Sequence, residues 1–278
     1  MTKMKLSLLL FFSLHLSAHA LTVMTYNIRL DVESDGPNAW AQRRDFFSSQ
    51  VRFYAPDVFG VQEATPGQVK DIEAALGQYG GVGVGRDGPG QGEASNIYYK
   101  KDRFEAAKAG TFWLSETPDK VSKGWDAAFN RVCTYALLKD RRTKKNFWVF
   151  NTHLDHVGEA ARTKGIQLIL AKMAALNTKK YPAVFMGDFN SEPGTDRIVA
   201  LRKEMNDARE VSEEKPFGPA GTFNGFKYDQ PATELIDYVF LSRPAGFKVK
   251  KYAVLTDSKD LRYPSDHFPV YVELDRGR

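Results

Sequence analysis

The chain has 278 residues, with 39 lysines and arginines against 34 aspartates and glutamates, and its formal charge is +5. Its single cysteine, Cys133, excludes an intramolecular disulfide and a cysteine-rich zinc site. So mild a charge gives only weak support for a protein that coats nucleic acid, because that task needs a dense basic surface.

The first twenty residues have the pattern of a secretory signal peptide. Lys3 and Lys5 form a short positive region, residues 6–16 are apolar, and residues 18–20 are a small-residue cleavage signal. The apolar run is too short to span a membrane. We therefore expect residues 1–20 to be removed, which lowers the charge to +3. Residues 21–278 are expected to be exported, to the periplasm or the extracellular space, as one domain without a transmembrane segment.

The rest of the chain is predicted to alternate between strands and helices. Apolar runs predict strands at 21–27, 58–62, 97–99, 111–114, 132–138, 147–151, 184–186, 235–241, 247–255 and 270–274. Helical periodicity predicts helices at 42–54, 67–76 and 159–176. The glycine-rich segment 80–92 is predicted to be a surface loop. Two mixed sheets with helices outside would bury every apolar face, so the predicted fold class is α/β.

Two segments leave alternatives open. The basic run at residues 139–145 fits a solvated hairpin turn or a nucleic-acid patch, and its position between two apolar strands favours the turn. Trp113, Trp125 and Phe129 flank a loop and fit either a substrate wall or the core, where aromatic residues are more common.

Polar side chains recur at the ends of the predicted strands. The segment Gly187-Asp188-Phe189-Asn190 directly follows a buried apolar run. Carboxylate, amide or imidazole groups occupy similar places at Asn27, Glu63, His153, Asp237, Asp266 and His267. Their oxygen atoms suit a hard cation, Mg²⁺ or Mn²⁺. Polar groups at several core strand ends assemble one site from distant pieces of chain, and this set predicts a metal-assisted hydrolase.

The histidines support that interpretation. Five are present, and His15 and His19 belong to the predicted signal peptide. Of the three that remain, His153 and His267 end apolar strands inside polar motifs, and the third is His156. Histidines beside carboxylates favour acid–base or phosphate-binding work.

Six motifs in order resemble those of the endonuclease/exonuclease/phosphatase superfamily, over residues 21–272. They are Thr25-Tyr26-Asn27-Ile28, Gln62-Glu63, Asn151-Thr152-His153-Leu154, Gly187-Asp188-Phe189-Asn190, Ile236-Asp237-Tyr238 and Ser265-Asp266-His267. Residues 110–118 and 151–156 resemble a bacterial, often exported subgroup of that superfamily. The resemblance implies a four-layered αββα sandwich of two packed mixed sheets for residues 21–278, with a catalytic site at one end.

The resemblance also implies a metal site and a nucleophile. Glu63, helped by Asn27, would hold the essential divalent cation on the scissile phosphate, and Asp266 would bind metal or position its neighbour. Asp188 would orient or deprotonate the attacking water, and Asn190 would bind the phosphoryl oxygens.

Both imidazoles receive roles from the same resemblance. His267, oriented by Asp237, would bind phosphate or transfer a proton. His153 would donate to the phosphate or leaving group, and Glu93 would orient it. A carboxylate partner is expected to raise the pKa of each imidazole.

Three further residues are predicted to contact substrate. Arg29 stands where some superfamily nucleases carry an Asp, which favours one metal over two and leaves Arg29 to hold a phosphate. Arg131 fits a phosphate contact or an ion pair with a neighbouring acid, and His156 fits a substrate contact or a helix start.

The resemblance therefore implies a divalent-cation-dependent hydrolase of phosphodiesters or phosphomonoesters, with diesters favoured. The substrate alternatives are a nucleic acid, as in a DNase-like nuclease, a lipid head group, as in a sphingomyelinase, and a small phosphorylated metabolite. A non-catalytic binding module on the same fold is the alternative of another class. The chain is expected to be a monomer with no stable protein partner.

Overall fold

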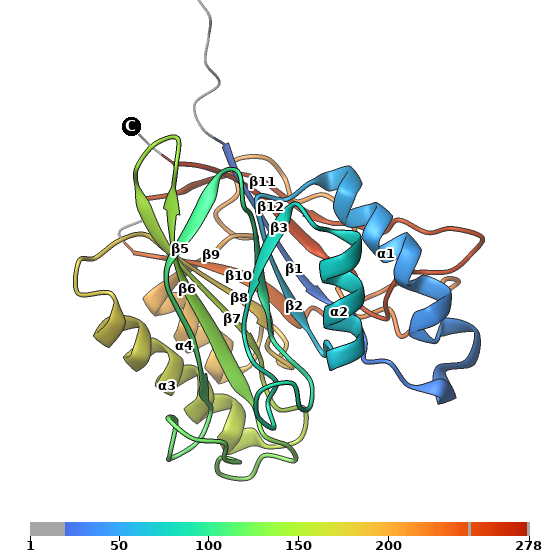
Figure 1. The fold of residues 1–278 in the computed structure, drawn as a ribbon, viewed down its shortest axis with the longest axis horizontal. Helices are drawn as coiled ribbons and strands as arrows, with labels where there is room; N and C mark the ends of the chain where they lie inside the picture. Colours follow the sequence, from blue (N-terminus) through green and yellow to red (C-terminus); the bar gives the residue numbers. More distant parts are fainter. Residues whose placement is uncertain (1–19, 244–245, 277–278) are drawn as a thin grey trace, which may run out of the picture.

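The strands form two six-stranded sheets that pack face to face (Figure 1). The computed structural model describes residues 20–243 and 246–276. In spatial order the first sheet consists of β11 (Lys248–Val254), β12 (Val270–Asp275), β1 (Ala20–Asn27), β2 (Val58–Gln62), β4 (Ile97–Lys100) and β3 (Tyr79–Val82). The second consists of β5 (Phe104–Trp113), β6 (Val132–Asp140), β7 (Asn146–His153), β8 (Ala183–Asp188), β10 (Asp237–Ser242) and β9 (Met205–Asp207).

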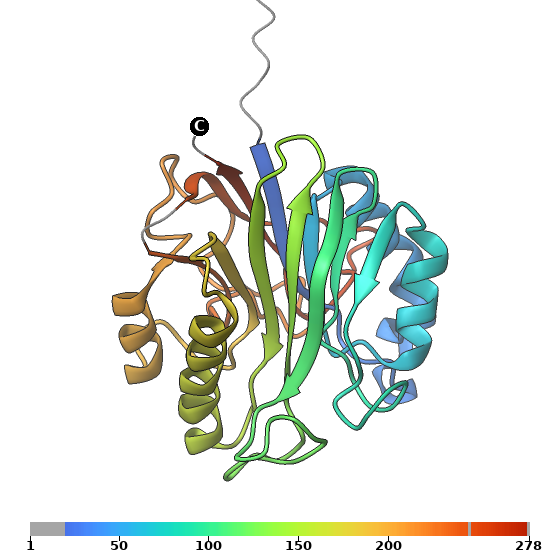
Figure 2. The same cartoon turned by 60° about the vertical axis from the view of Figure 1, so that its left-hand side comes forward.

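Helices cover the two outer faces of this pair of sheets (Figure 2). On the first sheet lie α1 (Trp40–Tyr54), preceded by the 3₁₀ turn η1 (Glu33–Asn38), and α2 (Pro66–Ala75). On the second lie α3 (Glu159–Leu176) and α4 (Asp196–Glu204). One apolar cluster fills the space between the sheets, and two more lie beneath the helix pairs. Each sheet is thus buried on both faces, as in the four-layered αββα sandwich that the resemblance implied.

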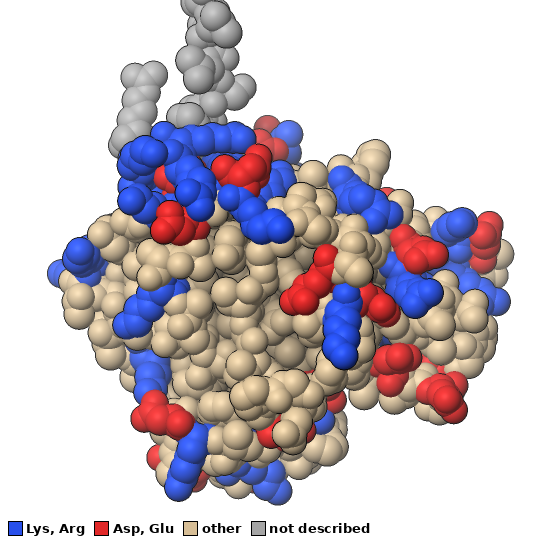
Figure 3. All heavy atoms as spheres, viewed as in Figure 1, with Lys and Arg blue, Asp and Glu red and all other residues tan. Residues whose placement is uncertain are grey.

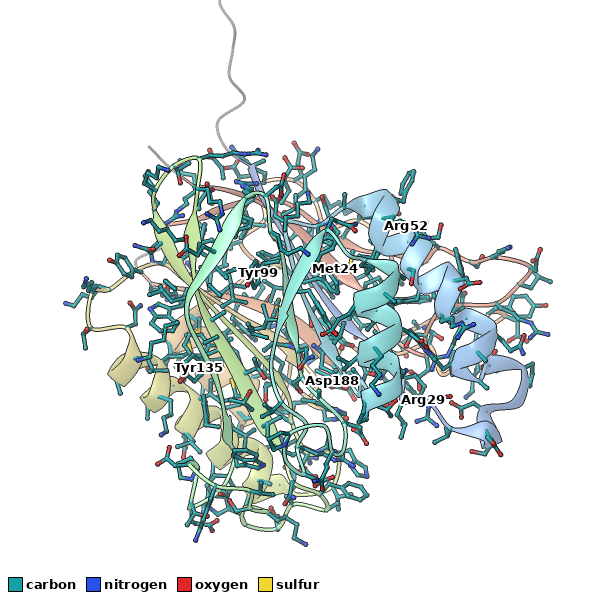
Figure 4. All side chains as sticks on the ribbon, viewed as in Figure 1. Met24, Arg29, Arg52, Tyr99, Tyr135 and Asp188 are labelled. Atoms are coloured by element: carbon teal, nitrogen blue, oxygen red, sulfur yellow. The ribbon has the colours of Figure 1, made fainter. Side chains whose placement is uncertain are left out.

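Strand direction brings the predicted site residues to one end of both sheets. β1 runs parallel to β2, with Asn27 beside Gln62, and β7 runs parallel to β8, with His153 beside Asp188. The carboxyl ends of β1 and β2 therefore lie at one edge of the first sheet, and those of β7 and β8 at one edge of the second. The hydrogen bond from Asn27 to Asp188, at 2.9 Å, shows that these two edges lie together. β10 is antiparallel to β8, so its first residue, Asp237, pairs with Asp188. Asp188 and Arg29 accordingly both lie toward the lower end of the molecule in Figure 4.

The predicted elements differ from the structure in a few places. The segment 80–92 is not all loop, because residues 79–82 form β3 against β4. The strand expected at 111–114 begins earlier, at Phe104, and pairs with β6 along its length. α4 and β9 were not predicted. β9 has only three residues, and α4, directly before it, lies in a stretch rich in charged side chains that shows little helical periodicity.

The basic run at 139–145 is a hairpin turn, as its position between apolar strands indicated. β6 and β7 pair antiparallel on either side of it. Basic side chains gather at this end of the molecule (Figure 3), opposite the end where Asp188 lies. The basic run at 139–145 is therefore remote from the predicted site.

The predicted signal peptide lies outside the described residues, apart from Ala20. Among the helices of the described residues, none has the length and apolarity to cross a bilayer.

Arg103 connects the two sheets through contacts with Ala20, Asp57 and Asp140. It is 6% exposed and donates to the Ala20 carbonyl at 3.0 Å, to Asp57 and to Asp140 Oδ2 at 3.3 Å. Replacing Arg103 with alanine would leave the buried Asp140 carboxylate without its cation and the buried Asp57 carboxylate with Lys100 alone, at 3.2 Å, which costs about 3–5 kcal/mol. We expect urea unfolding to show a loss of that size, while removal of the exposed Arg52 changes stability by less than about 0.5 kcal/mol. A loss below about 1 kcal/mol for Arg103→Ala would show that the pair contributes little.

Candidate active site

Asp188 is the centre of the site, at the end of the buried strand β8. Gly187 before it has φ 146°, and a Cβ there would lie 2.0 Å from the Thr152 carbonyl oxygen, so only glycine lets β8 approach β7 this closely. Asp188 Oδ1 accepts a hydrogen bond from the Asn190 main chain at 2.8 Å, and Oδ2 accepts one from Asn27 Nδ2 at 2.9 Å. Both oxygens are therefore fixed.

Asp237 and His267 form a buried pair beside Asp188. His267 Nδ1 lies 2.9 Å from Asp237 Oδ2, and its Nε2 lies 3.9 Å from Asp188 Oδ2. The Asp237 contact fixes the ring so that Nε2 faces the site. The prediction that Asp237 orients His267 agrees with this geometry.

Upward pKa shifts of both groups set the roles of Asp188 and His267. Burial, with a further contribution from the charge of Asp237, raises the pKa of Asp188 to about 7. Burial alone would lower the pKa of His267, but the charge and hydrogen bond of Asp237 outweigh it and raise that pKa well above its ordinary value. Near neutral pH the site thus pairs a carboxylate able to take a proton with an imidazolium.

His153 differs from His267. Its Nε2 lies 3.5 Å from Asp188 Oδ2, but burial, followed by the charge of Arg131, lowers its pKa well below the ordinary value. The expectation that carboxylates raise both imidazole pKa values is right for His267 and wrong for His153. Among the described residues Glu93 makes no hydrogen bond to His153; its Oε2 accepts one from Arg86 Nη1 at 2.8 Å. The orienting role predicted for Glu93 is therefore not what its contacts show.

Asn27 joins the two sheets at the site and also contacts Glu63. Asn27 Nδ2 donates to Glu63 Oε1 and to Asp188 Oδ2, both at 2.9 Å, and the Leu30 main chain donates to Glu63 Oε2. Asn27 Oδ1 accepts a hydrogen bond from the Arg29 main chain at 3.0 Å. Asn27 thus positions both carboxylates in this arrangement.

Three site residues hold a backbone conformation that favours glycine. Arg29, Glu63 and Asn190 have φ values of 55°, 64° and 44°. Such conformations are uncommon for these residue types and cluster at functional sites. Asn190 also donates from Nδ2 to the Leu154 carbonyl at 2.9 Å, which fixes its side chain at the pocket wall.

The carboxylates at this edge fit a divalent cation. Glu63 and Asp266 both line the pocket, and burial, together with the charge of Glu63 among other groups, raises the pKa of Asp266. A cation between the two would relieve their repulsion, and oxygen donors suit Mg²⁺ or Mn²⁺.

A second carboxylate cluster also lies close enough to hold an ion. Ligand atoms of Asp188, Asp237 and His267 lie within 4.8 Å of one another. However, the nitrogen and oxygen that join Asp237 to His267 are already 2.9 Å apart. An ion bound there would have to break that hydrogen bond, so Glu63 and Asp266 fit a cation better than this trio does.

Arg29 is held at the mouth of the site. Its Nε and Nη2 donate to both carboxylate oxygens of Asp35 at 2.9 and 3.0 Å. Its Nε lies 3.9 Å from Asp266 Oδ2. The side chain lines the pocket as predicted, but its charge is matched by Asp35.

Asp155, which the sequence did not single out, organises the opposite wall. Its Oδ1 accepts hydrogen bonds from the main chains of Val157 and Gly158, where α3 begins, and its Oδ2 accepts one from Ala128. Oδ2 also lies 3.2 Å from Arg131 Nε. The sequence signal was its place in the motif of residues 151–156, two residues after His153.

Those contacts make Asp155 a source of pH-dependent stability. Burial alone would raise its pKa, but main-chain hydrogen bonds and Arg131 outweigh it and lower the pKa. A depressed carboxyl pKa stabilises the fold above about pH 4 and ceases to do so as the pH falls through the folded-state value. The stability gap between the native chain and Asp155→Asn is therefore expected to shrink as urea unfolding is repeated from pH 7 down to pH 3. A gap that stays constant with pH would contradict this explanation.

Arg131 and His156 lie on the same wall. Arg131 Nη2 lies 3.1 Å from His156 Nδ1, and the His156 ring stacks on Phe129 with centroids 5.9 Å apart. Phe129 is 49% exposed, whereas Trp113 is 8% exposed and donates from Nε1 to the Arg86 carbonyl. The aromatic wall proposed from the sequence therefore consists of Phe129, while Trp113 belongs to the core and holds Arg86.

These groups surround one cavity of about 580 Å³. Its lining includes ten of the twelve residues predicted as catalytic, metal-binding or substrate-binding: Arg29, Glu63, Glu93, Arg131, His153, His156, Asp188, Asn190, Asp266 and His267. The other two, Asn27 and Asp237, lie behind the lining and contact Asp188 and His267. The sequence missed Arg86, which also lines the cavity.

Comparison with known proteins agrees with the fold. The model of the Endonuclease/Exonuclease/phosphatase family matches residues 24–267. A mannosyl-6-phosphatase of Bacteroides thetaiotaomicron VPI-5482 is 39% identical, with a TM-score of 0.86, over 91% of this chain and 99% of that one. A functionally unknown protein of Enterococcus faecalis V583 is 35% identical, with a TM-score of 0.86, over 92% of this chain and 100% of that one.

Curated relatives are more distant, and the chain matches only part of each. The CCR4-Not complex 3′-5′-exoribonuclease subunit of Kluyveromyces lactis is 25% identical over 65% of this chain and 29% of its own length. The chain matches 60% of the length of an uncharacterized protein of Acanthamoeba polyphaga mimivirus, so it corresponds to only part of these relatives. The family match spans every motif that forms the cavity, from Asn27 to His267. The chain belongs to the endonuclease/exonuclease/phosphatase family, whose members hydrolyse phosphoester bonds.

Proposed function

We propose that this chain is an exported phosphomonoesterase that uses Mg²⁺ or Mn²⁺ to remove phosphate from a phosphorylated sugar. The observation that carries the proposal is the buried set of Asp188, His267 and Asp237, in which a carboxyl with pKa about 7 lies next to an imidazolium. A phosphorylated sugar is proposed as the substrate because the mannosyl-6-phosphatase is 39% identical to this chain and covers 91% of this chain's length. Export is supported by the signal peptide pattern of residues 1–20.

In the proposed reaction Asp188 takes a proton from the attacking water. A base with pKa near the working pH combines the correct protonation state with sufficient basicity. Asn190, whose main chain bonds Asp188 Oδ1, is placed to contact a phosphoryl oxygen from the same wall.

Charge on the phosphoryl group is balanced from the other sides. Protonated His267 presents Nε2, because Nδ1 is held by Asp237. Neutral His153 presents a second imidazole without adding charge. A cation held by Glu63 and Asp266 would neutralise charge that develops on the phosphoryl oxygens.

A diesterase is the second candidate. The sequence alone favoured a diester, and one relative is named as a 3′-5′-exoribonuclease, which cleaves phosphodiesters. The basic run at 139–145 lies at the end opposite Asp188, which speaks against a long nucleic acid at this site.

The two candidates differ in the esters they cleave. With Mg²⁺ present, residues 21–278 are expected to hydrolyse p-nitrophenyl phosphate with a higher kcat/KM than bis(p-nitrophenyl) phosphate. The reverse order, or cleavage of RNA in preference to both, would establish the diesterase instead. The non-catalytic alternative predicts no turnover of either ester.

A further inference from the structure

We propose that Arg86, Glu93 and Phe129 form a subsite that binds the uncharged, hydroxyl-rich ring of the substrate beside the scissile phosphate. The inference rests on the proposed phosphomonoesterase function and names the part of the pocket that selects a sugar. It excludes substrates with a second phosphate near this wall.

Charge matching in the cavity is the first observation. Each arginine in the lining has a carboxylate partner: Arg29 with Asp35 at 2.9 Å, Arg86 with Glu93 at 2.8 Å, and Arg131 with Asp155 at 3.2 Å. The lining contains no lysine among the described residues, and it also carries Glu63, Asp188, Glu234 and Asp266. A polyphosphorylated ligand or a nucleic-acid strand needs unmatched cations for its further phosphates, and this cavity provides none.

The chemistry of the Arg86 wall is the second observation. Arg86 and Glu93 side chains are each 14% exposed and place donors and an acceptor side by side. Such a matched pair can bind adjacent hydroxyl groups, one accepting and one donating, without attracting a net charge. Two-way hydrogen bonding of this kind favours a sugar over an alkyl group.

Phe129 supplies an apolar surface next to that pair. The Arg86 guanidinium lies 4.6 Å from the centre of the Phe129 ring, which fixes the ring against the polar wall. Even so, 49% of Phe129 stays exposed. A pyranose ring has both apolar C–H surface and hydroxyl groups, which matches an exposed ring beside an ion pair.

The subsite lies next to the reacting centre. A smaller hollow connects Arg86, Glu93 and Arg131 with His153 and Glu63. Trp113 Nε1 and the Glu93 carbonyl hold the Arg86 main chain from both sides, at 2.6 and 2.8 Å. The wall is therefore fixed within reach of a phosphate at His153.

The test compares two primary alkyl monoesters, mannose 6-phosphate and ethyl phosphate. Both have an alkoxide leaving group, and only the first has a ring with hydroxyl groups. The native chain is expected to favour mannose 6-phosphate, and Phe129→Ala and Glu93→Gln are each expected to reduce the ratio of the two kcat/KM values at least tenfold. Phe53→Ala, which removes an 80% exposed ring from α1, and Glu213→Gln, which breaks a surface pair with Lys250, serve as matched controls.

Glu93→Gln adds a readout that a structural role would not give. The change leaves Arg86 with only the more distant Asp87, whose Oδ2 lies 3.8 Å from Arg86 Nε, so fructose 1,6-bisphosphate is expected to gain at least threefold in kcat/KM relative to mannose 6-phosphate. If both variants leave the ratio of the two kcat/KM values unchanged, because mannose 6-phosphate and ethyl phosphate lose equally or not at all, the subsite is overturned. The proposed phosphomonoesterase function is then unaffected. Failure of the native chain to cleave either monoester, with diesters cleaved, would overturn the proposed function itself.

Discussion

Replacement of His267 by alanine is expected to lower kcat about 10²–10⁴-fold on any phosphoester that the chain cleaves. The imidazolium is buried, its Nδ1 lies 2.9 Å from Asp237, and its Nε2 faces Asp188. Its removal takes a positive charge and a donor from the place where phosphoryl charge develops. The measurement is steady-state turnover of p-nitrophenyl phosphate with saturating Mg²⁺.

Asp237→Asn checks the reason for that loss. Asp237 raises the pKa of His267, so its neutral replacement is expected to lower that pKa. If activity needs protonated His267, it falls as the pH rises through this pKa, and the alkaline limb of the kcat profile moves to lower pH in Asp237→Asn. An alkaline limb that does not move, or His267→Ala retaining more than about a tenth of native kcat, would contradict the role of the imidazolium.

Glu63→Gln is expected to reduce activity about as much as His267→Ala, because it weakens binding of the divalent cation. A carboxylate that holds a metal contributes several kcal/mol of transition-state stabilisation, so kcat/KM at fixed Mg²⁺ is expected to fall about 10²–10⁴-fold. The amide keeps the size of the side chain and can still bond to the Leu30 main chain, so the fold should be retained. The measurement is turnover across a Mg²⁺ titration, in which the variant needs more cation than the native chain.

A matched substitution on α2 separates the site from general charge effects. Glu73 is exposed on that helix and lies outside the cavity lining, so Glu73→Gln should leave the titration unchanged. If Glu63→Gln follows the native titration curve, the cation is held elsewhere, and the Asp188, Asp237 and His267 trio becomes the metal site.

Most of the fold could be predicted because buried strands have a recognisable sequence pattern, a continuous apolar run. The runs that became β1, β2, β7 and β8 are continuous and apolar, and each is followed directly by polar residues. Parallel pairing then brought Asn27, Glu63, His153 and Asp188 to one edge. α4 and β9 were missed because one is short and largely charged and the other has three residues.

Contacts made by loops could not be predicted in the same way. Glu93 follows the glycine-rich turn, whose hydrogen bonds bring it to Arg86, seven residues earlier, and not to His153. The low pKa of His153 depends on burial and on Arg131, which lies on another strand end. Asp155 organises its wall by accepting hydrogen bonds from main-chain N–H groups. Every residue type except proline has such a group, so the sequence does not indicate which ones Asp155 contacts.

We propose a cation-dependent phosphomonoesterase whose pocket selects a sugar. The most direct test is phosphate release from mannose 6-phosphate by residues 21–278, with Mg²⁺, with EDTA, and after Mg²⁺ is restored. We expect release that EDTA abolishes, that Mg²⁺ restores and that His267→Ala lacks. Release that persists in EDTA, or no release from this ester when a diester is cleaved, would contradict the claim.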